Sequence, residues 1–190
     1  KICKIQIDKI SSSTIYIIFW QLFFLPNQLK KNNCDILYVL GGVFFRKTIK
    51  TVSIFQNILP FIEDQTKRYN FLNQIKLFIQ KKIYINTFSK SDGLIFLSNY
   101  SKRILSKEIS FSKKKIMVIP HGVSDIFKFK KRKINKKNIK IIYVSKIDIY
   151  KNQTKIIMAL KKLKDKFNIN LSLVGSYNNK YKRILLKKIN

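Results

Sequence analysis

Apolar runs and amphipathic stretches alternate along most of this chain of 190 residues. Short apolar runs bounded by glycine, proline or asparagine are typical of buried strands, and apolar residues spaced three and four apart are typical of helices. The runs predict parallel strands at residues 35–40, 51–56, 93–97, 115–119, 139–144 and 169–174. Strands that alternate with helices indicate an α/β protein whose parallel sheets are covered by helices on both faces.

The first predicted helix follows the serine and threonine cluster at residues 11–14, which is a suitable N-cap, and runs to Leu25, where Pro26 ends it. The apolar run 15–25 has eleven residues. A bilayer takes about 20 residues to cross, so this run is interpreted as a buried core helix.

Four further helices are predicted from the later amphipathic stretches. They span residues 68–86, with Leu72, Ile75, Ile79 and Ile83 on one helical face; 99–105, capped by Ser98; 153–167, with Ile156, Leu160, Leu163 and Phe167 inward; and 179–188.

The segment 128–138 breaks the pattern, because it is rich in lysine and has almost no apolar residues. We interpret it as a linker or an exposed loop. It divides the chain into a first unit, residues 1–127, and a second unit, residues 139–190. Each unit is predicted to be Rossmann-like, and each is expected to hold only part of such a domain.

Two lysines, Lys146 and Lys151, stand five residues apart in the loop between a predicted strand and a predicted helix. The free N–H groups and the dipole at a helix N-terminus favour phosphate there. Ligands of open α/β sheets bind beyond the carboxyl ends of the strands, and Lys146, Gly175, Asn57 and Ser98 all lie at or just past such ends. The loop is therefore predicted to bind an anion; a solvated basic loop is the alternative.

The chain carries 40 basic and 9 acidic residues, a formal charge of +31. This charge suggests nucleic acid or an anionic membrane as a partner. Base composition is the competing explanation, because lysine, isoleucine and asparagine have AT-rich codons. The lysines are spread along the chain, and the aromatic residues fall mostly in apolar runs expected in the core, whereas nucleic-acid-binding proteins show clustered lysines with exposed aromatics. We expect no specific nucleic-acid partner, but a basic nucleic-acid-binding protein stays as the alternative function.

No metal site is expected. Cys3 and Cys34 are isolated in the sequence, which favours a reducing compartment or simple use in the core. His121 is the only histidine, which excludes zinc motifs that need a histidine pair.

Several motifs stand in an order and at a spacing that resemble one enzyme family. Residues 118–123, Val-Ile-Pro-His-Gly-Val, resemble its pattern "vipNGVD", and residues 144–152, which hold both lysines, resemble "yvGRLdxxKN". Further matches lie at residues 35–38, 56–61, 91–102 and 173–175. From about residue 35 to its end, the chain resembles the family 4 glycosyltransferases, also known as group 1.

The resemblance implies a GT-B fold, with residues 1–127 as the C-terminal part of the acceptor-side domain and residues 139–190 as the first part of the donor-binding domain. The implied reaction is a retaining transfer of a hexose from a nucleotide-diphosphate sugar to a glycan, lipid or polysaccharide, as in synthesis of the cell envelope. No cofactor or obligatory metal is implied, and the lack of an Asp-x-Asp motif agrees with this. Such an enzyme is expected in the cytoplasm, either free or in peripheral contact with anionic lipid at the inner face of the membrane.

The same resemblance assigns residues to the donor side. Lys151 matches the family's lysine, and Lys146 stands where the family has arginine, so both are expected to bind the donor diphosphate. Arginine would bind a diphosphate through two parallel hydrogen bonds, whereas lysine acts as a point charge. Ser145, Asn152 and Gly175 are further candidates for the donor cleft.

Asn57 and Ser98 are candidates for the acceptor cleft, with a strand-end turn and a helix cap as their alternative roles. His121 is interpreted as part of a structural turn, in which Gly122 supplies backbone freedom, with catalysis as its alternative. The family's glycine-rich loop and paired glutamates are absent from this chain, so catalytic residues are not identified. The chain is expected to be a central slice of an enzyme and inactive alone; a non-catalytic remnant is a third alternative.

Overall fold

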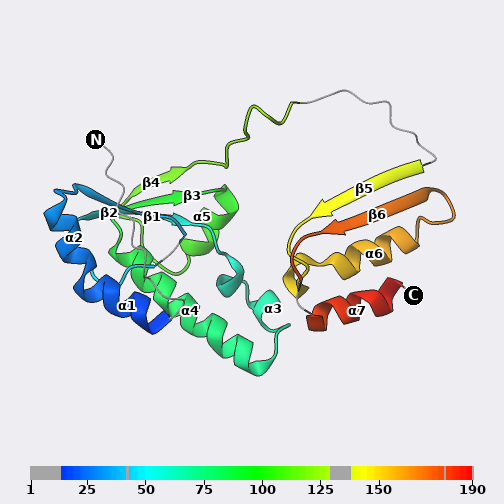
Figure 1. Cartoon of the computed structure of the whole chain (residues 1–190), viewed down its shortest axis with the longest axis horizontal. Helices are drawn as coiled ribbons and strands as arrows, with labels where there is room; N and C mark the ends of the chain where they lie inside the picture. The colour runs from blue at the N-terminus through cyan, green and yellow to red at the C-terminus, as the bar shows by residue number, and fades with distance from the viewer. Residues whose placement is uncertain (1–13, 42, 129–137, 178, 190) are drawn as a thin grey trace. The chain divides into compact units, whose positions relative to one another are not determined.

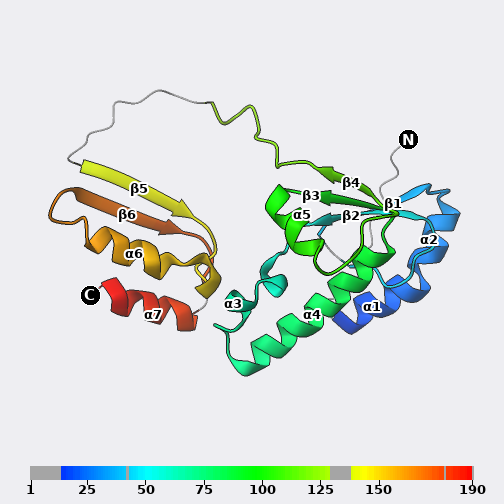
Figure 2. The same cartoon turned by 180° about the vertical axis from the view of Figure 1, so that it is seen from behind.

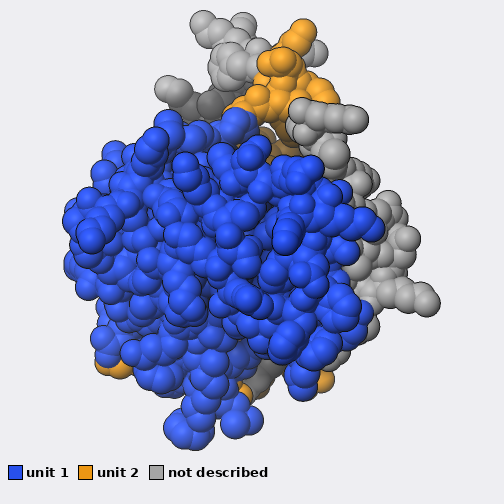
Figure 3. Space-filling view, turned by 90° about the vertical axis from the view of Figure 1, so that its left-hand side faces the viewer, with its two compact units in different colours: residues 1–66, 71–122 blue, residues 67–70, 123–190 orange. Residues whose placement is uncertain are grey.

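The computed structural model describes residues 14–41, 43–128, 138–177 and 179–189. The chain forms two compact units, which Figure 3 colours separately. Unit 1 comprises Lys1–Thr66 and Phe71–Gly122, and unit 2 comprises Lys67–Asn70 and Val123–Asn190. The expected cap residues 11–13 and most of the expected linker, residues 129–137, lie outside the described residues.

Unit 1 is built on a parallel sheet of four strands in the order β1-β2-β3-β4. The strands are β1 Ile36–Val39, β2 Lys50–Phe55, β3 Gly93–Phe96 and β4 Lys115–Val118. Each lies within one residue of its predicted bounds, and the register pairs Ser53 with Leu94 and Leu94 with Ile116. The prediction of parallel strands in an α/β fold is confirmed here.

The helices of unit 1 are α1 Thr14–Phe23, α2 Leu25–Lys31, η1 Leu59–Phe61, α3 Glu63–Thr66, α4 Phe71–Lys90 and α5 Asn99–Leu105. The prediction that Pro26 ends the helical run is wrong. Pro26 lies in the first turn of α2, where its missing N–H would have no helical partner anyway. The side chains of Ile15, Phe19 and Phe23 on α1 are exposed, so the expectation of a buried core helix is also wrong.

The core of unit 1 lies between the sheet and the second half of α4. Its buried side chains are Phe55, Tyr84, Phe88, Leu94, Phe96, Leu105 and Ile109. Leu72, Ile75 and Ile79, which the sequence placed on one face of this helix, are exposed and do not pack in this core. Apolar residues occur on several sides of this helix, so its spacing alone could not identify the face that packs.

The described helices cover one face of the unit 1 sheet, with α1 and α4 on the same side (Figure 1). Ile36, Tyr38 and Met117 are exposed on β1 and β4. The strand order follows the chain without reversal, and right-handed crossovers that always step in one direction put successive helices on the same face. Coverage of both faces, which the sequence predicted, is therefore not found in the described part of unit 1.

A charged cluster joins the N-terminal ends of β2, β3 and β4. Asp92 accepts hydrogen bonds from Lys47 Nζ at 2.6 Å and from the backbone N–H of Thr51 at 2.9 Å. Lys114 Nζ donates to the carbonyl oxygens of Ser89 and Ser91 at 2.7 and 2.6 Å. The Lys47 hydrogen bond, followed by that from Thr51, lowers the pKa of Asp92, whereas burial lowers the pKa of Lys114.

Acid should weaken unit 1 partly through Asp92. Its pKa is lowered from an ordinary value of 3.8, so its contribution to stability is complete above that value and is lost as the pH falls through the folded-state pKa. The side chain is 44% exposed, so we expect a contribution of only about 0.2–1 kcal/mol. Urea unfolding at neutral pH and near pH 3 should show a smaller acid loss in Asp92→Asn than in the native protein. Asp125→Asn, at an exposed position, is the control and should keep the native acid loss.

Unit 2 contains two parallel strands, β5 Asn138–Val144 and β6 Asn168–Val174, joined through η2 Ile149–Lys151 and α6 Gln153–Lys161. The helix α7, Asn179–Ile189, follows β6, and Figure 2 shows α6 and α7 on the same side of the two strands. Ile157, Tyr181 and Leu185 form its core.

Two expectations for unit 2 are wrong. Ile142 and Val144 are exposed on β5, so the described helices leave one face of this sheet open. The helix α6 ends at Lys161 rather than at residue 167, and Leu163 and Phe167 are exposed instead of packing inward. The chain continues through turns after Lys161, so these residues no longer lie on the helical face that packs on the sheet.

His121 and Gly122 lie at the end of unit 1, and both are exposed. Gly122 does not adopt a positive φ, and a Cβ atom there would meet nothing within 4 Å. The interpretation that Gly122 supplies backbone freedom for this turn is therefore wrong.

Among the described residues, no helix combines the length and apolar character that a membrane span requires.

Candidate anion-binding site

The loop between β5 and α6 is held against the segment that leaves β6. The backbone N–H of Ser145 donates to the carbonyl of Val174 at 2.9 Å, and that of Ile147 donates to Ser176 at 2.8 Å. Gly175 has a φ of +148°, and a Cβ atom there would overlap the carbonyl oxygen of Ser145. The close approach of the two segments therefore requires glycine at residue 175.

Asp148 organises the middle of the loop. Its Oδ1 accepts hydrogen bonds from the backbone N–H of Ile149 at 2.7 Å and from the hydroxyl of Tyr69 at 3.0 Å. Its Oδ2 lies 3.3 Å from Lys146 Nζ, which is itself half exposed. Burial, followed by the hydrogen bond to Asp148, raises the pKa of Tyr69. Asp148 thus holds the Lys146 ammonium at the rim of the loop.

Lys151 and Asn152 lie where η2 passes into α6. Lys151 Nζ lies 4.8 Å from the centroid of the Tyr150 ring. Asn152 has a φ of +57°, a conformation that asparagine adopts more readily than most residues. Its side chain does not cap α6 but accepts a hydrogen bond at 2.6 Å from Arg68, in the 67–70 segment of unit 2.

Gln153 is 1% exposed and ties the start of α6 to the end of β5. Its Nε2 donates to the carbonyl of Lys146 at 2.9 Å and to the hydroxyl of Ser145 at 3.2 Å. Its Oε1 is buried without a hydrogen-bond partner among the described residues. The hydrogen bond from Gln153 therefore fixes the backbone of Lys146, while the Lys146 side chain stays half exposed.

All five residues predicted for the donor side, Lys146, Lys151, Ser145, Asn152 and Gly175, are brought together at this loop. Sequence reasoning missed Asp148, Gln153, Tyr69 and Arg68. Asp148 could have been found from the preference for aspartate at helix caps, because it is the N-cap of η2. Tyr69 and Arg68 carried no such signal, since they lie 79 and 84 residues from their partners.

The acceptor-side candidates lie in unit 1. Asn57 follows β2, and its Oδ1 accepts a hydrogen bond from the N–H of Leu59 at 3.3 Å. Ser98 follows β3, and its Oγ accepts from the N–H of Ser101 at 3.2 Å, so its predicted role as N-cap of α5 is confirmed. Both side chains thus have a local structural role, and their predicted contact with an acceptor stays a prediction.

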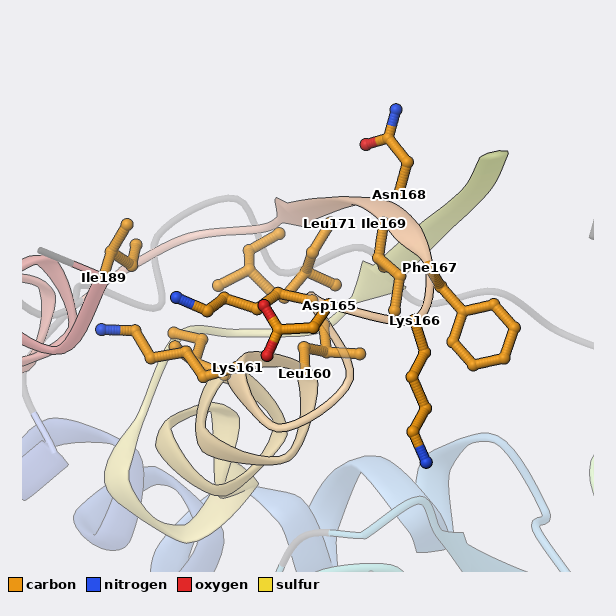
Figure 4. A pocket seen from close by; sticks show the side chains of 12 residues that line it. Leu160, Lys161, Asp165, Lys166, Phe167, Asn168, Ile169, Leu171 and Ile189 are labelled. Carbon is orange, nitrogen blue, oxygen red and sulfur yellow. The ribbon is translucent and has the colours of Figure 1, made fainter. Parts of the chain in front are cut away.

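A pocket of about 770 Å³ lies at the opposite end of unit 2, around the start of β6 (Figure 4). Leu160, Ile169 and Leu171 supply apolar surface, and Phe167 and Asn168 point away from them. Ligands of open α/β sheets bind at the carboxyl ends of strands, so this position does not favour the pocket as the main ligand site. No group of histidine, cysteine, aspartate or glutamate suited to a metal ion occurs among the described residues.

The family model for Glycosyltransferase Family 4 matches residues 6–125. The match covers more than half of the chain, so the chain belongs to this family and carries a glycosyltransferase domain. No curated protein matches the chain. The matched residues end before β5, so the loop of Lys146 and Lys151 lies outside the match.

Proposed function

We propose that this chain acts in a retaining, nucleotide-sugar-dependent glycosyltransferase. The enzyme moves a hexose from a nucleotide-diphosphate donor to a glycan, lipid or polysaccharide acceptor in synthesis of the cell envelope. The family match supports glycosyl transfer as the class of reaction. The donor and the role of the loop rest on the geometry at the start of α6.

The observation that carries the proposal is that two lysines belong to the segment between β5 and the N-terminus of α6. The carbonyl of Lys146 accepts a hydrogen bond from the side chain of Gln153, the first residue of α6. Lys151 lies one residue before the N-cap, Asn152. The side chain of Asn152 does not cap the helix, so it leaves the N–H groups of Gln153 and Thr154 to other acceptors. The N–H of Lys155, in contrast, donates to the carbonyl of Asn152. Helix N–H groups and two ammonium groups together suit a diphosphate.

In this proposal the lysines contribute to catalysis through electrostatics. Negative charge grows on the leaving diphosphate as the bond to the sugar breaks, and a cation fixed beside it stabilises the transition state more than the ground state. Asp148 keeps Lys146 oriented before the donor arrives. Neither lysine needs to transfer a proton, and no metal is required for this role.

Replacing Lys151 with alanine should weaken binding of nucleoside diphosphates. Loss of a charge-assisted hydrogen bond costs roughly 1.5–3 kcal/mol, equivalent to about ten- to hundredfold in Kd. Calorimetric titration with UDP, GDP and ADP measures the change. Lys161→Ala, which removes an exposed lysine at the other end of the same helix, is the matched control and should bind as the native protein does. Lys146→Arg should also bind normally, because it restores the residue usual in the family.

Other results of this titration would favour the alternatives. Equal binding by Lys151→Ala and the native protein would remove the site assignment. Absence of nucleotide binding by the native protein would favour a non-catalytic remnant. The exposed rings of Phe19, Phe23, Phe71 and Phe78, together with the formal charge of +31, favour a nucleic-acid-binding protein. Tight, sequence-selective binding of nucleic acid at physiological salt would favour that function instead.

A further inference from the structure

The first half of α4 exposes a continuous row of apolar side chains that the core does not use. Phe71 and Leu72 are each 74% exposed, and Ile75, Phe78 and Ile79 are also exposed. These residues fall at intervals of one, four, seven and eight from Phe71, which places them on one side of a helix. We call these five residues the α4 stripe. The buried side chains of α4, Tyr84, Thr87 and Phe88, all come from its second half.

The surroundings of the α4 stripe are basic. Lys76 and Lys82 on the same helix are exposed, and Lys82 Nζ lies 5.5 Å from the centroid of the Phe78 ring. The sequence of α4 contains no aspartate or glutamate. The carboxylate of Glu108 is paired at 2.5 Å with Lys81 on α4, which is partly buried. This surface therefore consists of a row of apolar side chains with accessible ammonium groups beside it.

We propose that the α4 stripe docks on an anionic lipid bilayer, with the phenylalanines and aliphatic side chains at the boundary of the acyl chains and Lys76 and Lys82 among the headgroups. Interfacial helices combine such an apolar face with lysines that reach up to the lipid phosphates. The charge of the chain favours this occupant over a second copy, because two chains of formal charge +31 repel each other, whereas an anionic surface attracts each of them. Leucine and isoleucine in the stripe favour it over nucleic acid, since they offer no ring for stacking on bases.

This inference does not depend on the proposed donor site. It concerns a surface of unit 1, whereas the lysine loop lies in unit 2. A transferase bound to a membrane in this way would meet acceptors that are themselves carried by lipid. Vesicle binding tests the docking surface independently of nucleotide binding.

Vesicle flotation tests the proposal with the whole chain. The probes are vesicles of phosphatidylcholine mixed with phosphatidylglycerol, and vesicles of phosphatidylcholine alone. The native protein should float with the anionic vesicles and much less with the neutral ones. The double variant Phe71→Ser/Phe78→Ser keeps every charge of the chain. Its partition coefficient should be roughly tenfold or more lower than that of the native protein, because two phenyl rings are no longer transferred from water to the bilayer.

The matched control removes an equal number of exposed apolar residues elsewhere. Ile126→Ser/Phe127→Ser, at positions 86% and 77% exposed, should partition as the native protein does. Lys76→Gln/Lys82→Gln should bind several-fold more weakly, with a smaller effect at high salt. The substituted side chains are exposed, and far-ultraviolet circular dichroism should report an unchanged fold.

Three results would overturn the proposal. One is failure of the native protein to bind anionic vesicles. Another is equal binding by the stripe variant and the Ile126/Phe127 control, which would leave net charge as the whole cause. The last is a combined result, in which the native protein sediments as a dimer, the stripe variant sediments as a monomer, and both bind vesicles equally. That result would identify a second copy of the chain as the occupant.

Discussion

Gly175→Ala should disrupt the lysine loop and remove nucleotide binding to a far greater extent than any single lysine substitution. A Cβ atom at this position overlaps the carbonyl oxygen of Ser145, and the φ of +148° is one that residues with a side chain rarely adopt. The backbone strain alone costs of order 1–3 kcal/mol. Relief of the overlap requires the end of β5 to move away from the end of β6, which breaks the backbone hydrogen bond between Ser145 and Val174.

The measurement is calorimetric titration with UDP, GDP and ADP, together with urea unfolding. Gly122→Ala is the matched control, because its Cβ meets nothing within 4 Å and its φ is not positive. That variant should match the native protein in stability and in nucleotide binding. If Gly175→Ala bound nucleotides as tightly as Gly122→Ala, the loop geometry described here would have no part in the proposed site.

Phe55→Ala should destabilise unit 1 by about 3–5 kcal/mol, the usual cost of deleting a buried aromatic ring. Phe55 is 1% exposed and stands at the centre of the core. Its ring centroid lies 5.1 Å from that of Phe61, 5.2 Å from that of Phe88 and 6.0 Å from that of Phe96. Its removal therefore leaves a cavity where β2, β3 and α4 meet, and domains of this size have little stability to spare.

Urea unfolding followed by circular dichroism should show the loss as a lower transition midpoint with an unchanged slope. Phe127→Ala removes the same side chain from a position that is exposed and should change the midpoint little. Equal midpoints for Phe55→Ala and Phe127→Ala would contradict the packing of this core.

The sequence alone determined the strands and the place of the candidate site. All six strands were predicted within one residue at each end, because short apolar runs between turn residues specify a buried strand through local geometry. The loop with Lys146 and Lys151 was predicted for a related reason. Strand, loop and helix follow one another directly in the chain, so the site needs no long-range information to be found.

Tertiary structure decided which surfaces pack and which polar groups meet. The apolar residues of α4 surround much of the helix, and the position of the sheet determines that Tyr84 and Phe88 are buried while Phe71 and Leu72 are exposed. The order of the strands places the described helices on one face of the unit 1 sheet, which periodicity cannot reveal. Asp148 meets Tyr69 across 79 residues of sequence. Local patterns record the conformation of a segment, whereas such contacts depend on how distant segments fold together, and this information is spread over the whole chain.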